Sequence, residues 1–162
     1  MSETLIREFE AKDAQQVEVC VAELQDFCKQ IDALAAPGTV AHRYFEHLLA
    51  QCAETEGAVF VAEQEGQVIG MVCVFARVQS KLVDEEDYEY AYVSDLVVLG
   101  AHRQKGLGHA LLQRAEEHAR SRGARFLRIG VHAPNKVARE LYVRDGFRER
   151  IVSLQKELRS DS

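Results

Sequence analysis

The chain has 162 residues, of which 47% are hydrophobic and 28% charged, and its formal net charge is −6 at pH 7. This length and composition fit one globular domain with a sizeable core. The acidic balance disfavours general nucleic-acid binding, which needs a basic surface, and the sequence lacks the run of about 18 apolar residues that predicts a membrane span. We therefore expect no nucleic acid and no membrane among its partners.

The four cysteines are widely spaced, and no Cys-x-x-Cys pair occurs. This spacing argues against a zinc site and against a disulfide scaffold. The six histidines are scattered without metal-ligand spacing, so we expect no metal. Residues 1–4 lack the basic and apolar regions of a signal peptide, and with the cysteine pattern this leads us to expect a reducing cytoplasm.

The first 57 residues predict a short strand at 4–9 and two helices, at 11–30 and 40–53, because apolar residues recur there at 3–4 spacing. Residues 58–64 and 67–78 predict a β-hairpin closed by Glu65-Gly66. Its second strand is apolar on both faces, which indicates burial on both sides.

A polar connection over residues 80–87 follows, and it carries the densest acidic cluster of the chain, Asp84-Glu85-Glu86-Asp87 with Glu89. Two interpretations stay open. The cluster is either a solvated loop or an acidic lip that attracts a cationic amine.

The next predicted strand runs over residues 88–99. A period of two places Tyr92 on one face together with Ser94, Leu96 and Val98, and Asp95 on the other. A β-bulge would change this assignment, because it shifts every later residue to the opposite face.

The rest of the chain predicts a glycine-bearing turn at 100–108, a helix at 109–122 and a strand at 125–131. A last helix ending at Gly146 and a terminal strand at 147–156 follow. Helices that alternate with strands after a hairpin indicate one α/β layered domain over residues 1–162. We divide it into an N-terminal part at 1–57, a central part at 58–147 and a terminal strand with a tail at 148–162.

The turn at 100–108 has the properties of a phosphate site, because it joins a strand to the beginning of a helix. The first helical N–H groups have no partner within the helix, and the helix dipole adds positive charge there. Gly106 and Gly108 allow close approach to the backbone, and Arg103 and Lys105 add full charges. The P-loop and dinucleotide patterns both fail, because neither Lys-Ser/Thr nor a third glycine follows.

The pattern Arg103-x-x-Gly106-x-Gly108 after a strand resembles the acyl-CoA pyrophosphate loop of the GNAT superfamily of N-acetyltransferases. A second stretch, Asn135 to Phe147, resembles the other signature of that family, with Ala138, Leu141-Tyr142 and Gly146-Phe147 at its spacing. The two motifs occur in the family order, separated by one helix and one strand. The resemblance covers the chain from about residue 58 to Phe147.

The resemblance implies an α/β three-layer domain in which helices flank both faces of a mixed, mostly antiparallel sheet. It also implies an enzyme that transfers acetyl from acetyl-CoA to a primary amine, by direct attack in a ternary complex. The acceptor would be a small cationic molecule, a protein lysine or a protein N-terminus, and a homodimer is a family-level expectation.

The resemblance assigns Tyr142 as the general acid beside the CoA sulfur. Many relatives carry a Glu on the Tyr92 or Ser94 face, which this chain lacks. Tyr92 occupies a position where many relatives carry that Glu. Two alternatives for the general base stay open. Either Asp95 or Glu89 acts through a water molecule, or the acceptor binds as the neutral amine and needs no base. The expected CoA-binding residues are Leu96, Val97, Val98, Arg103, Gln104, Lys105, Gly106, Leu107, Gly108, His109 and Asn135.

Two other functions compete with this interpretation. The missing Glu at Tyr92 and Ser94 is compatible with a non-catalytic CoA-binding module, a sensor or partner-binding domain. The loop after residue 100 would also accept a different phosphate ligand. Turnover with any amine would exclude the first, and CoA binding would exclude the second.

Overall fold

A computed structural model describes residues 2–159. Five strands form one sheet in chain order. Neighbouring strands are antiparallel except the last pair, which is parallel, so the predicted mixed and mostly antiparallel sheet is confirmed. The strands are β1 (Thr4–Glu8), β2 (Ala58–Gln64), β3 (Gln67–Gln79), β4 (Glu89–Val98) and β5 (Leu127–Ile129).

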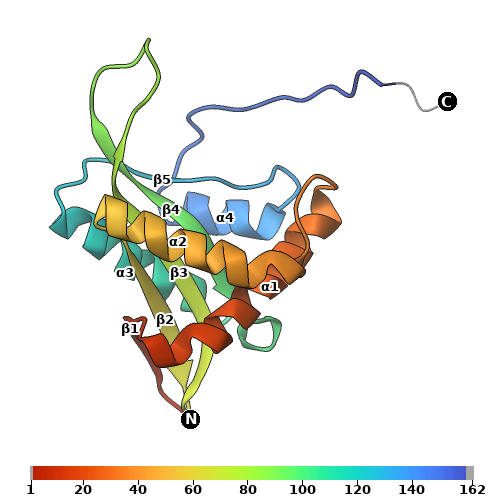
Figure 1. The fold of residues 1–162 in the computed structure, drawn as a ribbon, viewed down its shortest axis with the longest axis vertical. Coiled ribbons are helices and arrows are strands. Elements are labelled where there is room, and N and C mark those ends of the chain that lie inside the picture. Colours follow the sequence, from red (N-terminus) through yellow and green to blue (C-terminus); the bar gives the residue numbers. More distant parts are fainter. Residues whose placement is uncertain (1, 160–162) are drawn as a thin grey trace.

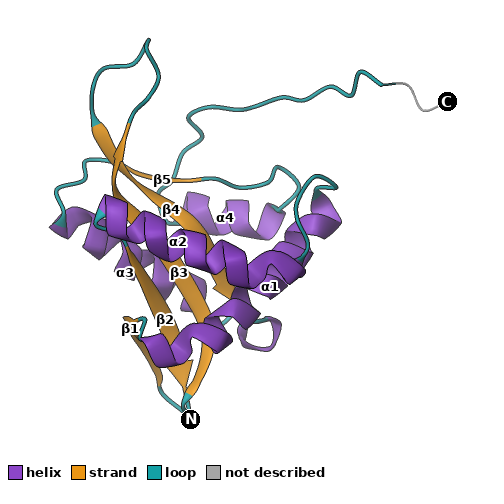
Figure 2. Cartoon of the chain, in the orientation of Figure 1, coloured by secondary structure: helices purple, strands orange, loops and turns teal. Residues whose placement is uncertain are grey.

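Helices cover both faces of the sheet, which confirms the three-layer α/β class (Figures 1 and 2). α1 (Ala14–Ile31) and α2 (Ala41–Thr55) bury their apolar stripes against one face, and α3 (Leu107–Ser121) and α4 (Lys136–Arg144) against the other. Two hydrophobic cores result, one on each side of the sheet. The 3₁₀ turns η1 (Ala11–Asp13), η2 (Gly38–Val40) and η3 (Gly100–His102) precede α1, α2 and the loop before α3.

A β-bulge interrupts β4 at Ser94. Cys73 of β3 lies opposite Asp95, whereas the next residue, Val74, lies opposite Val93, so that Ser94 is an extra residue on β4. The regular alternation that the sequence predicts for this strand is therefore wrong beyond Val93.

The bulge moves Asp95 to the face that carries Tyr92, toward α1 and α2. Val97 accordingly joins the core on that side, while Leu96 and Val98 pack against the core of α3. A one-residue slip reverses the face of every later side chain, so the bulge decides what lies beside Asp95.

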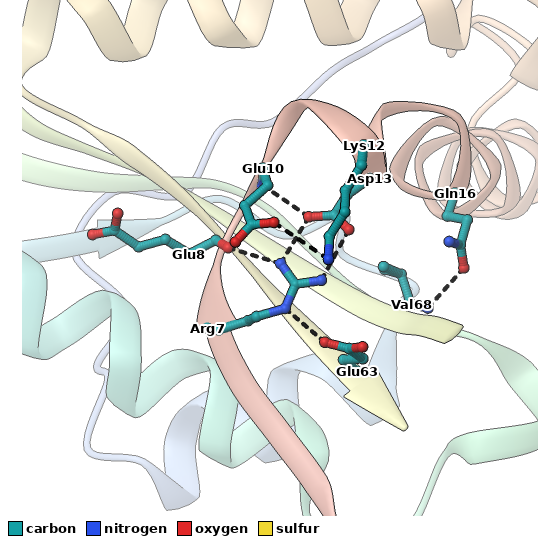
Figure 3. A network of polar contacts seen from close by, with 8 residues as sticks. All are labelled: Arg7, Glu8, Glu10, Lys12, Asp13, Gln16, Glu63 and Val68. Carbon is teal, nitrogen blue, oxygen red and sulfur yellow. Dashed lines mark hydrogen bonds and ion pairs between the residues drawn. The ribbon is translucent and has the colours of Figure 1, made fainter. Parts of the chain in front are cut away.

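A polar network fastens the beginning of α1 to the sheet (Figure 3). The Arg7 guanidinium on β1 donates to both carboxylate oxygens of Asp13, at 2.8 and 2.9 Å, and to Glu63 of β2 at 2.7 Å. Asp13 is only 2% exposed, and the Gln16 side chain accepts a hydrogen bond from the backbone N–H of Val68. The network fixes where α1 leaves the sheet.

The predicted terminal strand at 147–156 is wrong. After Phe147, whose N–H donates to the carbonyl of Tyr142 at 2.9 Å, residues 148–159 form neither a helix nor a strand. We call residues 148–159 the C-terminal arm. In Figure 1 it extends away from the body beyond α4 and β5. A strand needs a neighbour to pair with, and this arm pairs with none within residues 2–159.

Candidate active site

A cavity of about 450 Å³ opens where β4 continues past the end of β5. The parallel pairing of the two strands stops at Val93 and Ile129, so among the described residues 2–159 the remainder of β4 pairs with β3 alone. The two strands form the floor and one wall, and α1, α2 and α4 form the others. The lining residues are Leu24, Gln25, Cys28, Tyr44, Tyr92, Val93, Ser94, Asp95, Leu96, Ile129, Gly130, Val131, His132, Asn135, Ala138 and Tyr142.

Asp95 is the one carboxylate among these lining residues, and it is 8% exposed. The Tyr44 hydroxyl on α2 donates to its oxygens at 3.0 and 3.2 Å. Burial raises the pKa of Asp95, and the hydrogen bonds of Ser94 and then Tyr44 oppose that rise. The pKa of Tyr44 is itself raised by burial and then by the Asp95 charge, so Tyr44 stays a donor.

Tyr92 lies beside Asp95 because of the bulge. Its hydroxyl reaches the backbone of Gly130 in the stretch after β5, and a Cβ at Gly130 would lie 2.9 Å from that oxygen. Glycine at this position therefore leaves room for the Tyr92 ring across the cavity floor. Burial, followed by the charge of Asp95, raises the pKa of Tyr92.

Tyr142 enters the cavity from α4. Its ring packs edge to face against Phe147 at 5.9 Å between centroids, and burial raises the pKa of its phenol to about 12. Asp95, Tyr92 and Cys28 are close enough to add to that rise. Tyr142 is thus a protonated group that shares a cavity with the buried carboxylate.

Asn135 also lines the cavity, but its side chain has a structural partner. Its carbonyl oxygen accepts a hydrogen bond from the backbone N–H of Ala138 at 3.2 Å, which caps α4. Capping leaves the side-chain NH₂ group able to donate into the cavity.

The loop from Arg103 to Gly108 presents backbone donors. Gln104 and Gly106 both have positive φ, of 64° and 79°, and this turns the chain sharply into α3. Within residues 2–159 no protein acceptor is recorded for the N–H groups of residues 104–109. The Arg103 side chain is half-exposed, and its Nε donates to the carbonyl of Val98 at 2.9 Å.

The beginning of α3 is fixed to α4 by its second and third residues. A Cβ at Gly108 would lie 3.1 Å from Leu141, so the helices approach closely there. His109 pairs through Nδ1 with Asp145 at 2.6 Å, so its side chain contacts α4. The N-terminus of α3 and Tyr142 are therefore held by the same helix contact.

The structure brings five of the predicted site residues to the cavity: Tyr92, Asp95, Leu96, Asn135 and Tyr142. The predicted CoA-binding residues Val97 and Val98 and the loop 103–109 lie outside its lining, and the Val97 side chain is in the core. Glu89, the other candidate carboxylate, instead pairs with Arg77 at 2.9 Å and does not line the cavity.

The acidic cluster at 84–87 does not reach the cavity either. It lies in the β3–β4 loop, which projects from the body in Figure 1. Glu85 accepts hydrogen bonds from Ser80, Tyr88 and Arg150, and Asp87 accepts one from Gln79. These contacts favour the solvated loop over the acidic lip.

Sequence reasoning missed the cavity residues on α1 and α2, above all Tyr44. Tyr44 lies within the helix predicted at 40–53, but only the tertiary fold shows that its hydroxyl meets Asp95. The stretch 129–132 was also missed, because a short strand end carries no motif. A tyrosine on the buried face of a helix was the one available signal, since its hydroxyl needs a partner.

Residues 2–159 contain no group of three or more His, Cys, Asp and Glu side chains that could hold a metal ion. In the same range no helix has both the length and the hydrophobicity needed to span a membrane.

The chain matches the acetyltransferase (GNAT) family over residues 22–147. It is 34% identical to an N-acetyltransferase of Methanocaldococcus jannaschii over 69% of its own length, and the match spans 47% of that protein. It is 30% identical to an N-alpha-acetyltransferase of Sulfurisphaera tokodaii, over 86% of this chain and 85% of that one.

Two solved structures have the same fold at low identity. An aminoglycoside N-acetyltransferase in complex with CoA superposes with a TM-score of 0.72 at 19% identity, over 96% of both chains. A glucosamine-6-phosphate N-acetyltransferase of Arabidopsis thaliana gives a TM-score of 0.66 at 19% identity, over 97% of this chain and 99% of that one. With the family match over most of its length, the chain belongs to the acetyltransferase (GNAT) family and is an acyltransferase.

Proposed function

We propose that the protein transfers acetyl from acetyl-CoA to a cationic primary amine, with Asp95 as the group that receives the amine. One observation carries the proposal. A buried carboxylate, Asp95, and a protonated phenol, Tyr142, line the same cavity, at the point where β4 loses its pairing with β5.

The acetyl-CoA would lie across the N-terminus of α3 and along β4. The N–H groups of residues 104–109 and the open approach at Gly106 suit the pyrophosphate. Beyond Val93 no strand of residues 2–159 pairs with the side of β4 that faces β5, so an extended pantetheine arm can pair with the backbone of Leu96 and Val98 as an added strand. Such a path would lead the thioester to Tyr142.

The transfer would proceed by direct attack. The amine nitrogen forms a bond to the thioester carbonyl carbon, and the C–S bond breaks. The proton lost by the amine passes to the carboxylate of Asp95, whose raised pKa makes it a better acceptor than an exposed aspartate. Tyr142 donates a proton to the departing thiolate, and its pKa of about 12 keeps it protonated until then.

The cavity chemistry supports a cationic acceptor. Asp95 supplies the negative charge, and the rings of Tyr44, Tyr92 and Tyr142 surround the same space with faces that attract cations. An alkylammonium group on a small molecule, or a lysine or N-terminus of a peptide, meets this requirement. The relative from Sulfurisphaera tokodaii, described as an N-alpha-acetyltransferase, makes peptide N-termini a natural part of the test panel.

The test is thiol release from acetyl-CoA in the presence of polyamines, aminoglycosides, lysine peptides and peptides with free N-termini. Calorimetric CoA binding is measured on the same protein. Turnover with one primary-amine class, and none with alcohols of the same shape, supports the proposal. CoA binding without turnover on any amine would contradict it, and so would tight binding of another nucleotide in place of CoA.

A further inference from the structure

Arg128 on β5 lies next to the cavity without being part of its lining. In the parallel pairing of β4 and β5 it lies opposite Tyr92, which lines the cavity. Residues that lie opposite each other in a sheet share one of its faces. The side chain of Arg128 is therefore on the face that carries Tyr92, toward α1 and α2.

The guanidinium of Arg128 is held against two aromatic rings of β4 and the loop before it. Its central carbon lies 4.1 Å from the ring centroid of Tyr90 and 5.2 Å from that of Tyr88, and one of its N–H groups donates to the Tyr88 hydroxyl. A planar guanidinium that stacks on a ring keeps its N–H donors directed outward in its own plane. No other hydrogen bond of this guanidinium is recorded within residues 2–159. Donors are therefore left for a ligand.

The charge of Arg128 is not matched by a carboxylate of its own, because none is recorded as its ion-pair partner within residues 2–159. Glu85 is connected to it through the Tyr88 hydroxyl, which donates to Glu85 at 2.9 Å. The same carboxylate pairs with Arg150, so these contacts set two guanidinium groups against one carboxylate. Arg128 is also half-buried. A partly desolvated cation without a carboxylate partner favours the binding of an anion.

Arg128 and Asp95 lie at the two ends of one row of side chains. Tyr90 and Tyr92 share a face of β4 because they are two residues apart, and the bulge places Asp95 on that face as well. With Ser94 as the extra residue of the bulge, the strand path from Tyr90 to Asp95 is about four steps of about 3.3 Å each. A ligand that contacts both Asp95 and Arg128 would span on the order of 10 Å.

We propose that Arg128 binds a carboxylate of the acceptor, so that the preferred acceptor is a primary amine with a carboxylate on the order of 10 Å from its nitrogen. The inference rests on the proposed function, in which Asp95 receives the amine. A guanidinium binds a carboxylate through two parallel N–H donors. The two contacts of opposite sign would fix the direction in which the acceptor enters the cavity, with its amine at Asp95 and its carboxylate at Arg128.

Two sources carry this chemistry. One is a small ω-amino acid such as ω-aminooctanoate. The other is a peptide with a free N-terminus and an acidic side chain at its third residue, since an extended chain advances about 3.3–3.6 Å per residue. In both, the amine and the carboxylate are separated by on the order of 10 Å.

The experiment measures how tightly paired amines bind to the full-length protein saturated with CoA itself, which has no acetyl group to transfer. One pair is ω-aminooctanoate and its carboxamide. The other is Ala-Ala-Glu-Ala and Ala-Ala-Gln-Ala, both amidated at the C-terminus. Calorimetry gives the ratio of the two dissociation constants in each pair for the wild type, Arg128→Gln and Arg125→Gln, and thermal unfolding checks that both variants are folded.

We expect the wild type to bind the carboxylate member of at least one pair at least about tenfold more tightly than its amide, and the pair that shows this preference identifies the source. In Arg128→Gln the ratio should fall to about one, although glutamine can still donate to the Tyr88 hydroxyl. Arg125→Gln is the matched control and should keep the wild-type ratio. Arg125 is exposed and stacks on Phe126 at 4.8 Å, so its substitution removes the same charge from another ring.

Equal binding of the carboxylate and the amide in both pairs by the wild type would overturn the proposal. A preference that survives in Arg128→Gln would also overturn it, and so would one that falls as far in Arg125→Gln. Failure of every amine to bind the CoA complex would contradict the proposed function, and this inference with it. Equal binding within each pair would remove the role of Arg128 alone, so the two failures are distinguishable.

Discussion

At the residue scale, the buried carboxylate of Asp95 lowers the stability of the fold but is suited to binding a ligand. A carboxylate that is 8% exposed, with a tyrosine hydroxyl as its partner and no cation recorded beside it within residues 2–159, is costly to keep ionised. Folds retain such groups where they serve a ligand. The arrangement predicts opposite effects of one substitution on stability and on turnover.

Asp95→Asn is expected to stabilise the fold at neutral pH, with Tm rising by roughly 2–4 °C for about 1 kcal/mol in a domain of this size. The amide keeps an acceptor for Tyr44 and removes the buried charge. Because burial raises the folded pKa of Asp95, the contribution of Asp95 to stability is fully present below its unfolded pKa and is lost as pH rises through the folded one. The gain in Tm should therefore vanish only below the unfolded pKa of about 3.9, and thermal unfolding at about pH 3 and pH 7.5 measures this. A lower Tm for the variant at neutral pH would contradict the assignment.

Tyr142→Phe is expected to reduce the single-turnover rate by about 100-fold while CoA affinity stays near normal. The phenol, not the ring, supplies the proton to the thiolate, and the ring still packs on Phe147. With its pKa raised to about 12 by burial, Tyr142 should stay protonated across the accessible range. The wild-type rate should therefore rise with pH as the amine loses its proton, without a fall up to about pH 10. An unchanged rate in the variant would remove Tyr142 from the mechanism.

At the element scale, the loop between β4 and α3 contains a glycine, Gly106, whose substitution tests CoA binding against a matched control. Gly106 and Gly66 have nearly identical φ angles, of 79° and 77°, and a Cβ at either meets nothing within 4 Å. Valine should therefore strain both turns similarly, but only Gly106→Val should place methyl groups where the pyrophosphate approaches.

We expect Gly106→Val to weaken CoA binding by at least about tenfold, or roughly 1.4 kcal/mol, and Gly66→Val to leave it unchanged. Calorimetry measures the CoA affinity of both variants, and thermal unfolding checks that the two substitutions change stability by a similar amount. Equal CoA affinities in the two variants would show that the loop does not hold the cofactor.

The anchor of α1 to the sheet is expected to be strong. Arg7→Ala would leave Asp13, which is 2% exposed, without its cation. Removing one partner of a buried ion pair costs about 3–5 kcal/mol, and Arg43→Ala on the exposed face of α2 is the control. The hydrogen bonds from Arg7 lower the pKa of Asp13, so the contribution is present above the unfolded pKa and is lost as pH falls through the folded one. Urea unfolding should show a difference in the free energy of unfolding between the wild type and Arg7→Ala that disappears in acid. A difference that does not depend on pH would contradict this role.

Sequence reasoning predicted the elements whose signals are local. Apolar spacing and helix-ending glycines indicated the four helices, and the glycine pattern after β4 indicated the loop from Arg103 to Gly108. The bulge at Ser94 could not be predicted from the sequence, because a bulge depends on how β4 pairs with β3. The contact of Tyr44 with Asp95 was equally hidden, since it joins residues 51 positions apart. The terminal strand failed for a related reason, because alternation shows that a segment can pair but not whether its own chain supplies the neighbour.

At the scale of the whole molecule, charge is distributed away from the cavity. The acidic β3–β4 loop projects from the body, and two of its carboxylates already accept hydrogen bonds. We therefore assign the attraction of a cationic acceptor to Asp95 alone.

The cytoplasmic location that the cysteine pattern leads us to expect stays a prediction.

Neutralising Asp84 and Glu86, as Asp84→Asn with Glu86→Gln, is expected to leave the KM for a cationic amine within about twofold at 0.1 M ionic strength, where charges are screened over about 10 Å. Steady-state thiol release measures this KM, with the wild type at the same ionic strength as the control. A clear rise in KM would restore the acidic lip as part of the acceptor site.

The most direct test of the account is kcat/KM for the preferred primary amine in Asp95→Asn, measured beside CoA affinity on the same protein. We expect a fall of about 100-fold or more with CoA affinity unchanged, because in the proposed mechanism the cofactor binds the loop and β4 while the amine binds the carboxylate. An Asp95→Asn enzyme that turns over amines as well as the wild type would show that Asp95 does not receive the amine.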